Sequence, residues 1–251
     1  MIFSTWQPIH HRLELSPDIA HVIRLNLNLA HEQWSPLIGL LSDEERARAT
    51  RFRFDEPRRQ FVICRATLRQ LLGTLYGVVP EAVSFHYGSC GKPELLFQEL
   101  TSSVPQIEFN VSHSGTIGLI AIATGASIGV DVEQMSPDVK FLQLAERFFA
   151  PTEATELKSL QPEKQLNGFY RGWTCKEAYI KAKGDGLSLS LSSFCVAIDP
   201  DQPASLCHVD DQPDEPTEWT TESLKVSENH AAAVMVRRRD CPIALWDWPV
   251  N

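Results

Sequence analysis

A carboxylate and an ammonium group, Glu177 and Lys181, lie four residues apart in the second half of the sequence. The surrounding residues predict a helix over about 173–183, because Gly184 follows a lysine-rich last turn and glycine commonly ends helices. The spacing places Glu177 and Lys181 on one helix face, and it also aligns Trp173 with Glu177. A solvated Glu–Lys pair on a surface helix has the same pattern, so this stripe alone leaves both interpretations open.

Two more carboxylates, Asp131 and Glu133, alternate with aliphatic residues over 127–135. If this segment is a strand, the two acids share one face and the aliphatic side chains share the other. Two carboxylates on one face repel each other unless a cation lies between them. A hard divalent ion such as Mg²⁺ suits this arrangement, because it takes oxygen ligands and keeps positions for water and substrate phosphates. The alternative is a strand end with two solvated acids.

Three polar residues, Asn110, Ser112 and His113, lie where a short apolar segment over 107–115 runs into a glycine turn. Polar side chains at a strand end are well placed to hold a ligand, although a lone histidine there is more often structural. A serine hydrolase is excluded on two grounds. The sequence has no GxSxG motif, and Ser112 and His113 would point to opposite faces of a strand.

Eight arginines fall between positions 46 and 69 of a chain whose formal net charge is −9. Guanidinium groups match phosphate oxygens in geometry, so the segment predicts a site for a polyphosphate ligand. For any single arginine, a solvated amphipathic face remains the better interpretation. These arginines are Arg46, Arg48, Arg51, Arg53, Arg58, Arg59, Arg65 and Arg69.

A glycine-containing loop over 87–96 ends in Gly91, Lys92 and Pro93. Gly91 permits a tight turn, Lys92 offers a positive charge and Pro93 fixes the backbone where the loop ends. An ordinary turn has the same residues, so this motif indicates a ligand only in combination with others.

Composition restricts the class of protein. The chain has 251 residues, 43% of them hydrophobic, which is enough for one large domain or two half-sized ones. The negative net charge disfavours general binding to nucleic acid or to an anionic membrane. Six scattered cysteines without metal-type spacing, together with the lack of a secretion signal or membrane span, predict a cytoplasmic protein with reduced thiols.

Hydrophobic periodicity predicts the main helices and strands. Ser42 and Glu45 have the form of a capping box, which opens a helix. The acidic segment 199–218 is predicted to be a loop, and the tail containing Trp246 and Trp248 has no predicted element. Strands are expected at 21–29, 117–123, 127–135, 193–198 and 230–236, and helices at 57–73, 141–149, 151–160 and 173–183.

A faint internal repeat is also present. The segment 41–45 resembles 149–153, and 61–73 resembles 172–184, so that Cys64 aligns with Cys175 and Arg65 with Lys176. The identities are few, so chance remains an alternative. A true repeat predicts an α+β fold with two similar halves in a pseudo-twofold arrangement, 1–124 and 125–251, and a ligand site between them.

Taken in order, the motifs GKP, FNVSHSG, GVDVE and WxxKEAxxK resemble the motif set of the phosphopantetheinyl transferases of the larger two-half type, the Sfp type. The resemblance covers about 41–191 and extends more loosely to the strand at 230. It implies transfer of 4'-phosphopantetheine from coenzyme A to a serine of an apo acyl or peptidyl carrier protein, with release of adenosine 3',5'-bisphosphate. Carriers of fatty acid, polyketide and nonribosomal peptide synthesis all fit this description.

The resemblance also implies roles for particular residues. Asp131, Glu133 and Glu177 would hold Mg²⁺, and Asp131, Glu177 and Lys181 would be catalytic, with the identity of the general base left open. Tyr87 to Lys92 would line the adenine end. The residues expected to contact coenzyme A are Arg48, Tyr87, Gly91, Lys92, Pro93, Asn110, Ser112, His113 and Lys181.

The resemblance further implies a monomer. A non-catalytic module that binds coenzyme A or a carrier protein is the main alternative, and a Mg²⁺-dependent phosphohydrolase is a second one. The presence of all three expected metal ligands counts against the non-catalytic module.

Overall fold

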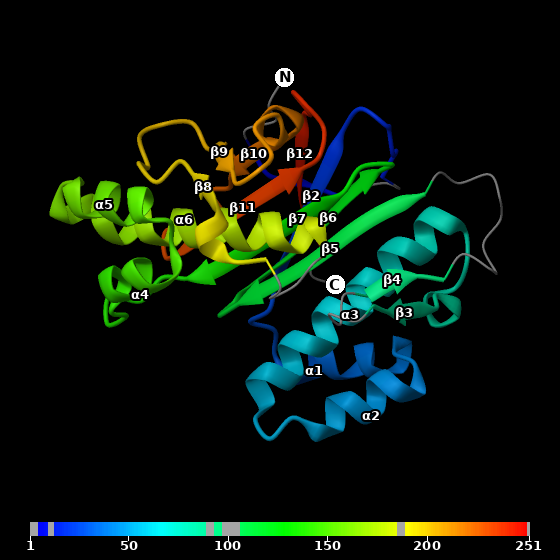
Figure 1. The fold of residues 1–251 in the computed structure, drawn as a ribbon. Helices are drawn as coiled ribbons and strands as arrows, with labels where there is room; N and C mark the ends of the chain where they lie inside the picture. The colour runs from blue at the N-terminus through cyan, green and yellow to red at the C-terminus, as the bar shows by residue number, and fades with distance from the viewer. Residues whose placement is uncertain (1–4, 10–12, 89–92, 97–105, 185–188, 250–251) are drawn as a thin grey trace.

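A computed structural model describes residues 5–9, 13–88, 93–96, 106–184 and 189–249. The predicted α+β fold is confirmed, with two main antiparallel-rich sheets and helices around them (Figure 1). The larger sheet has the order β1 (Gln7–Pro8), β12 (Ile243–Asp247), β2 (Ala20–Asn26), β6 (Ile117–Thr124) and β5 (Ile107–Ser114). The smaller sheet has the order β10 (Thr220–Ser223), β11 (His230–Val236) and β7 (Ile128–Gln134).

Two further sheets have two strands each. They pair β3 (Phe85–Tyr87) with β4 (Pro93–Leu95), and β8 (Phe194–Val196) with β9 (Leu206–Val209). Strand β9 and a short 3-10 helix at Glu215–Glu218 lie inside the segment that was predicted to be a loop, so that prediction was wrong for these residues.

Strand β12 comes from the tryptophan-containing tail, for which no element was predicted. It pairs in parallel with β2 and also with β1, whereas the neighbouring pairs β2–β6 and β5–β6 are antiparallel. The sheet formed mainly by the first half therefore contains a strand from near the end of the sequence.

The first half contains α1 (His31–Trp34), α2 (Asp43–Arg51) and α3 (Asp55–Tyr76), and the second half contains α4 (Phe141–Phe148), α5 (Pro151–Ser159) and α6 (Pro162–Lys183). In Figure 1, α1–α3 lie at the lower right and α4 and α5 at the left. No helix in the described ranges has the length and apolar character needed to cross a membrane.

The long helices α3 and α6 have 22 residues each. Helix α3 contacts β5 and β6, and α6 contacts β7 and β11. Each helix ends at a glycine in the left-handed region, Gly77 with φ 71° and Gly184 with φ 78°, where a side chain would be strained. The predicted helix over 173–183 is the second half of α6, which begins earlier because Pro162 favours the first helical position.

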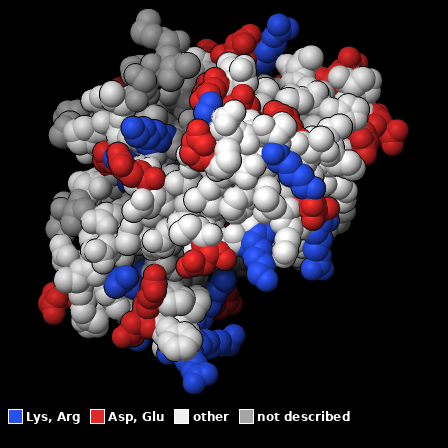
Figure 2. Space-filling model, turned by 90° about the vertical axis from the view of Figure 1, so that its left-hand side faces the viewer, with Lys and Arg blue, Asp and Glu red and all other residues white. Residues whose placement is uncertain are grey.

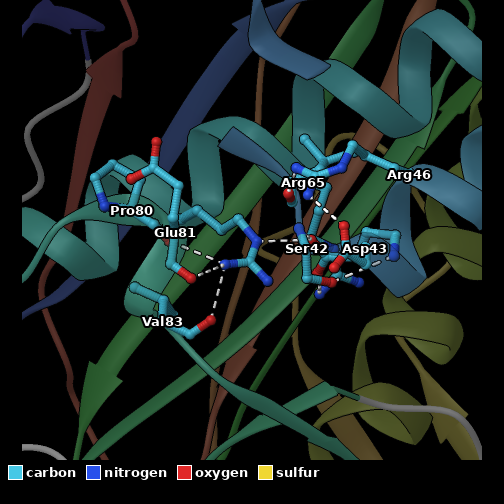
Figure 3. A network of polar contacts seen from close by, with 10 residues as sticks. Ser42, Asp43, Arg46, Arg65, Pro80, Glu81 and Val83 are labelled. Atoms are coloured by element: carbon cyan, nitrogen blue, oxygen red, sulfur yellow. Dashed lines mark hydrogen bonds and ion pairs between the residues drawn. The ribbon is translucent and has the colours of Figure 1, made fainter. Parts of the chain in front are cut away.

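The capping box predicted at Ser42 is confirmed. The Glu45 amide donates to Ser42 Oγ (3.3 Å), and the Ser42 amide donates to Glu45 Oε2 (2.9 Å). The buried Glu45 carboxylate also accepts a bond from Arg69 Nε on α3 (2.6 Å) and lies 3.5 Å from Arg65 (Figure 3). Helix α2 is thus fixed to α3 through one carboxylate.

The second half repeats this contact with different residues. Glu153 on α5 accepts a bond from the Ala150 amide (2.9 Å) and pairs with Lys176 Nζ on α6 (2.7 Å). Lys176 is fully buried and also donates to the carbonyl oxygens of Leu191 (2.8 Å) and Phe194 (2.5 Å). The sequence alignment of Arg65 with Lys176 therefore corresponds to a shared structural contact.

Buried apolar side chains fill the space between the two main sheets, and the two halves share this cluster. It includes Val22 and Leu119 from the larger sheet and Val130 and Val234 from the smaller one. Strands β5 and β7 lie next to each other at the line where the halves meet (Figure 1).

Candidate active site

Strands β5 and β7 lie side by side but belong to different sheets, and polar side chains of β5 bridge them. Every second residue from position 110 on β5 accepts a hydrogen bond from a β7 backbone amide. We call these three contacts the β5–β7 seam. The acceptors and donors are Asn110 Oδ1 with the Val130 amide (3.1 Å), Ser112 Oγ with the Val132 amide (3.4 Å), and Ser114 Oγ with the Gln134 amide (3.0 Å).

Asp131 lies on β7 within this seam and is only 3% exposed. Its Oδ1 atom accepts hydrogen bonds from Ser112 Oγ (2.9 Å) and Lys181 Nζ (2.6 Å). Its Oδ2 atom is buried and accepts no hydrogen bond from any described residue. A buried carboxylate oxygen without a partner is costly, so this atom has the capacity to bind a cation or a further donor.

Glu133 and Glu177 are half-buried beside Asp131, and Ser114 Oγ donates a hydrogen bond to Glu133 Oε2 (3.1 Å). Burial and the negative charge of Asp131 raise the pKa of both glutamates, while Lys181 opposes the shift. The three carboxylates are therefore close enough to repel one another, and this repulsion disappears when a cation binds between them.

This set of oxygen donors, with one orphaned oxygen on Asp131, fits a hard divalent cation. Among the described residues, no group of three His, Cys, Asp or Glu side chains stands in coordinating positions for a metal. The predicted shared face of Asp131 and Glu133 is consistent with their contacts, because each carboxylate meets a serine of β5.

Helix α6 can carry Glu177 and Lys181 to β7 because β7 has a glycine where the two elements cross. A Cβ atom at Gly129 would lie 2.6 Å from the backbone nitrogen of Ala182, and closer still to the carbonyl oxygen of Ala178. Only glycine allows this approach. Trp173, in contrast, packs against Phe149 and Phe169 in the core and does not contribute to the site.

Ser112 and His113 lie on opposite faces of β5, as predicted, since Ser112 is buried and His113 is exposed. Desolvation by the surrounding protein and the positive charge of Lys181 lower the pKa of His113. The Ser112 hydroxyl donates to Asp131 and accepts from the Val132 amide and from Lys181 Nζ (3.1 Å). One donor and two acceptor positions are all that a hydroxyl has.

The prediction that the arginine segment serves a polyphosphate ligand was wrong for three of its members. Arg65 and Arg69 pair with Glu45, and Arg69 also donates to the carbonyl oxygens of Pro80 (2.9 Å) and Val83 (2.8 Å). Arg46 bonds Asp43 beside the same network (Figure 3). These guanidinium groups connect α2, α3 and the following loop.

Arg48 differs from these three arginines. It is exposed on α2, and its guanidinium carbon lies 4.9 Å from the centre of the Phe61 ring. A cation held over an aromatic face keeps its outer donors available for a ligand.

The residues predicted to surround the adenine are only partly visible. Gly91, Lys92 and the side chain of Tyr87 lie outside the described residues. The backbones of Tyr87 and Pro93 pair across the strands β3 and β4, which lie on either side of residues 89–92 in the sequence.

Sequence reasoning missed Ser114 and Glu153. Ser114 continues the alternation begun by Asn110 and Ser112, which is the signal that could have revealed the seam. Glu153 takes the same position in its helix as Glu45, and this was noticed only as part of the repeat.

Comparison with known proteins relates both halves to one family. Residues 127–235 match the 4'-phosphopantetheinyl transferase superfamily, and residues 28–125 match the N-terminal part of 4'-phosphopantetheinyl transferase. The 4'-phosphopantetheinyl transferase HetI of Nostoc sp. is 39% identical to this chain, over 94% of this chain and 95% of HetI.

Two proteins of Bacillus subtilis are also similar. One, a 4'-phosphopantetheinyl transferase, is 34% identical over 68% of this chain and 72% of its own length. The other, the 4'-phosphopantetheinyl transferase Sfp of strain 168, is 28% identical over 88% of this chain and 92% of its own length. The two matched ranges contain β5, β6 and β7, and they therefore include the β5–β7 seam.

Proposed function

This chain belongs to the 4'-phosphopantetheinyl transferase superfamily, and from this premise we propose how its residues act. The enzyme transfers phosphopantetheine from coenzyme A to a carrier protein. We propose that the acceptor is a serine of an apo acyl or peptidyl carrier, and that the products are the holo carrier and adenosine 3',5'-bisphosphate. The nucleophile is then the serine of the carrier protein and not a residue of this chain.

Asp131, Glu133 and Glu177 are the residues we assign to Mg²⁺. The observation that carries this assignment is the buried, unpartnered Oδ2 of Asp131 beside two glutamates whose pKa values its charge raises. Bound Mg²⁺ would neutralise the diphosphate of coenzyme A as its phosphoanhydride bond breaks, with one phosphate passing to the serine and the other leaving on adenosine 3',5'-bisphosphate. Glu177 is also a candidate to accept the serine proton, a role that competes with its role as a metal ligand.

Lys181, His113 and Arg48 are assigned to the phosphates of coenzyme A. Lys181 projects from α6 beside Asp131, so a diphosphate held at the three carboxylates would meet its ammonium group. Exposed His113 lies on the neighbouring strand, within reach of the charge of Lys181. We keep Tyr87 to Lys92 as the proposed adenine end, and Pro93 as a proposed contact to coenzyme A.

The division into halves, 1–124 and 125–251, is proposed with the site between them. Ser112 from β5 and Asp131 from β7 meet in the seam, which supports this location. We propose a monomer that works in the cytoplasm, on the basis of the family resemblance and the scattered cysteines. Basic and acidic side chains are interspersed on the face shown in Figure 2, which favours a local anion site over a broad cationic surface.

The decisive experiment measures the intact mass of apo acyl and peptidyl carriers after incubation with this enzyme, coenzyme A and Mg²⁺, with and without EDTA. We expect a gain of one phosphopantetheine arm that EDTA abolishes. Asp131→Ala should lower the transfer rate by about a thousandfold or more, because a ligand and a charge are both lost. Asp138→Ala, a control at an exposed acid on the loop after β7, should transfer at the normal rate.

Undiminished transfer by Asp131→Ala at matched circular dichroism would overturn the metal assignment. Release of unattached phosphopantetheine without a carrier would instead favour the phosphohydrolase. Coenzyme A binding without any transfer to either type of carrier would favour the non-catalytic module.

Arg48 has its own test, which compares coenzyme A with dephospho-coenzyme A. Arg48→Ala should raise KM for coenzyme A by about tenfold and change KM for the dephospho form little, because a charge-assisted phosphate contact contributes about 1.5–3 kcal/mol. Arg51→Ala, also exposed on α2, is the matched control. Equal losses for both substrates would remove Arg48 from the 3'-phosphate.

A further inference from the structure

Ser114 makes two hydrogen bonds that serve different purposes. Its Oγ atom accepts a bond from the Gln134 amide (3.0 Å), which joins β5 to β7. The same hydroxyl donates to Glu133 Oε2 (3.1 Å), the carboxylate that immediately precedes that amide. Ser112, two residues earlier on β5, has the corresponding pair of contacts with the Val132 amide and Asp131.

Asn110 shows what joining the strands requires on its own. Its side-chain oxygen accepts a bond from the Val130 amide, and the residue preceding that amide is Gly129, which has no carboxylate. An acceptor is therefore sufficient to bridge the strands. At the two positions where a carboxylate precedes the amide, β5 carries a hydroxyl, which is both donor and acceptor.

The backbone around Ser114 is fixed by contacts from both halves. His230 on β11 bonds the carbonyl oxygen of Ser114 through Nε2 (3.2 Å) and Ser227 Oγ through Nδ1 (2.8 Å). Gln60 on α3 donates to the carbonyl oxygen of Gly115 (2.8 Å), whose φ of 53° suits glycine. A hydroxyl held on such a rigid turn can define the orientation of the carboxylate that it contacts.

We propose that Ser114 is a positioning residue for the metal, because its hydroxyl orients the Glu133 carboxylate and so increases the affinity of the site for a divalent cation. This inference rests on the proposed function, which assigns Glu133 to Mg²⁺. By the same geometry, Ser112 orients Asp131. Its hydroxyl donates to Asp131 and accepts from the Val132 amide and from Lys181, which uses all of its hydrogen-bonding positions. Serines of the first half thereby orient the proposed metal ligands Asp131 and Glu133, which belong to the second half.

The test uses Mn²⁺ as a spectroscopic probe in place of Mg²⁺. Binding of Mn²⁺ alone to the full chain is measured by electron paramagnetic resonance, without coenzyme A or carrier protein. Ser114→Thr and Ser114→Val have nearly the same shape and differ in the hydroxyl. We expect Ser114→Val to weaken Mn²⁺ binding by about tenfold, as removal of a residue behind a metal ligand commonly does. Ser114→Thr should stay within about twofold of the unchanged enzyme.

Ser136→Ala is the control, because Ser136 follows β7 and its hydroxyl accepts a bond from the Asp138 amide without touching a carboxylate. Its Mn²⁺ affinity should be unchanged. Equal affinities for Ser114→Val and Ser114→Thr would overturn the proposal, whatever the stability of either variant.

A double-mutant cycle separates positioning from a general loosening of the seam. In a Glu133→Ala background, which removes the acceptor of the Ser114 hydroxyl, Ser114→Val should weaken Mn²⁺ binding no further than Ser114→Thr. A further tenfold loss in that background would show that the hydroxyl acts elsewhere, which overturns the proposal.

In the transfer assay, Ser114→Val should need about tenfold more Mg²⁺ for half-maximal rate while kcat at saturating Mg²⁺ changes little. A lower kcat with unchanged Mg²⁺ demand would contradict the inference. Failure of the proposed function itself would leave the unchanged enzyme without transfer, and the Mn²⁺ titrations do not depend on transfer.

Discussion

The two halves of the molecule have the same local design, but only the second carries the acids of the site. Helices α3 and α6 are equally long, end at left-handed glycines and bury a cysteine at aligned positions, Cys64 and Cys175. At the position aligned with Glu177, however, α3 has Ala66, and opposite Lys181 it has Gln70. The two halves share the scaffold, and the side chains proposed to carry the chemistry lie mainly on one of them.

The short helix before each long one shows a second difference. Glu45 pairs with two arginines, Arg65 and Arg69, whereas Glu153 pairs with one lysine, Lys176, that is 0% exposed. Burial raises the pKa of Glu153 and lowers that of Lys176, so desolvation opposes both charges of this pair. We infer that the stability of the second half depends more strongly on the pair of Glu153 with Lys176 than the stability of the first half depends on the pairs of Glu45.

The largest difference between the halves should follow from breaking these pairs. Glu153→Ala should lower the free energy of unfolding by about 3–5 kcal/mol, because it leaves the Lys176 ammonium buried without its partner. Glu45→Ala should cost less, because the guanidinium groups that it leaves behind are more weakly hydrated than a lysine ammonium and lose less when they are desolvated. Denaturation by guanidinium chloride measures both costs.

Glu156→Ala, at an exposed acid on α5, is the control and should be neutral within about 0.5 kcal/mol. Equal costs for Glu153→Ala and Glu45→Ala would show that the two anchors are energetically equivalent.

A smaller effect is expected from glycines at the crossings of helix and strand. Gly129→Ala should cost about 3 kcal/mol and reduce transfer, because the added Cβ meets the α6 backbone, which cannot move without shifting Glu177. Gly118→Ala should cost about 1 kcal/mol, because its Cβ meets the Cys64 sulfur (3.0 Å), which can rotate away. Thermal unfolding and the transfer assay are measured on both variants.

The control here is Gly39→Ala, where a Cβ has no atom within 4 Å. Retained activity in Gly129→Ala, with normal stability, would mean that α6 does not need this close approach.

The smallest effect concerns the two buried thiols and should be equal in the two halves. Burial raises the pKa of Cys64 and of Cys175 from 9.0 to about 12. Between pH 9 and 12 the unfolded thiols lose protons while the folded ones keep them. Each thiol therefore contributes stability that is fully present below pH 9 and falls by about 1.4 kcal/mol per pH unit above it.

Unfolding measured between pH 8 and 10.5 should show a shallower alkaline loss in Cys64→Ala, and an equal change in Cys175→Ala. Cys207→Ala, at an exposed cysteine, should leave the pH dependence unchanged. A change of the pH dependence in only one of Cys64→Ala and Cys175→Ala would mean that water reaches the two thiols differently in the folded protein.

Much of the fold could be predicted because its elements carry local signals. The alternation in β2, the capping box at Ser42 and the glycine stop at Gly184 each depend on neighbours in the sequence. Strands β9 and β12 were missed because both are short and lie among acidic or tryptophan-containing residues without clear alternation. The local sequence of β12 has no clear strand signal, and the strand is stabilised by its pairing with β2.

The arrangement of the site could be predicted in part. The alternation of Asp131 and Glu133 and the spacing of Glu177 and Lys181 are regular, and the contact between Asp131 and Lys181 agrees with both patterns. The arginines were misjudged because Glu45, the acid that pairs with Arg69, lies just outside the segment that was counted. The second role of the seam serines depends on a neighbouring strand from the other half, which no local pattern encodes.

The parallel pairing of β12 with β1 and β2 has a consequence for biosynthesis. Strand β1 has β12 as its neighbour in the sheet, and β12 follows every other described strand in the sequence, so it is synthesised after them. The first half can bury α3 on β5 and β6 early, but its sheet remains open until β12 has been synthesised. Completion of this edge is then a late, long-range event, which is the kind of step that slows folding and exposes an unpaired strand.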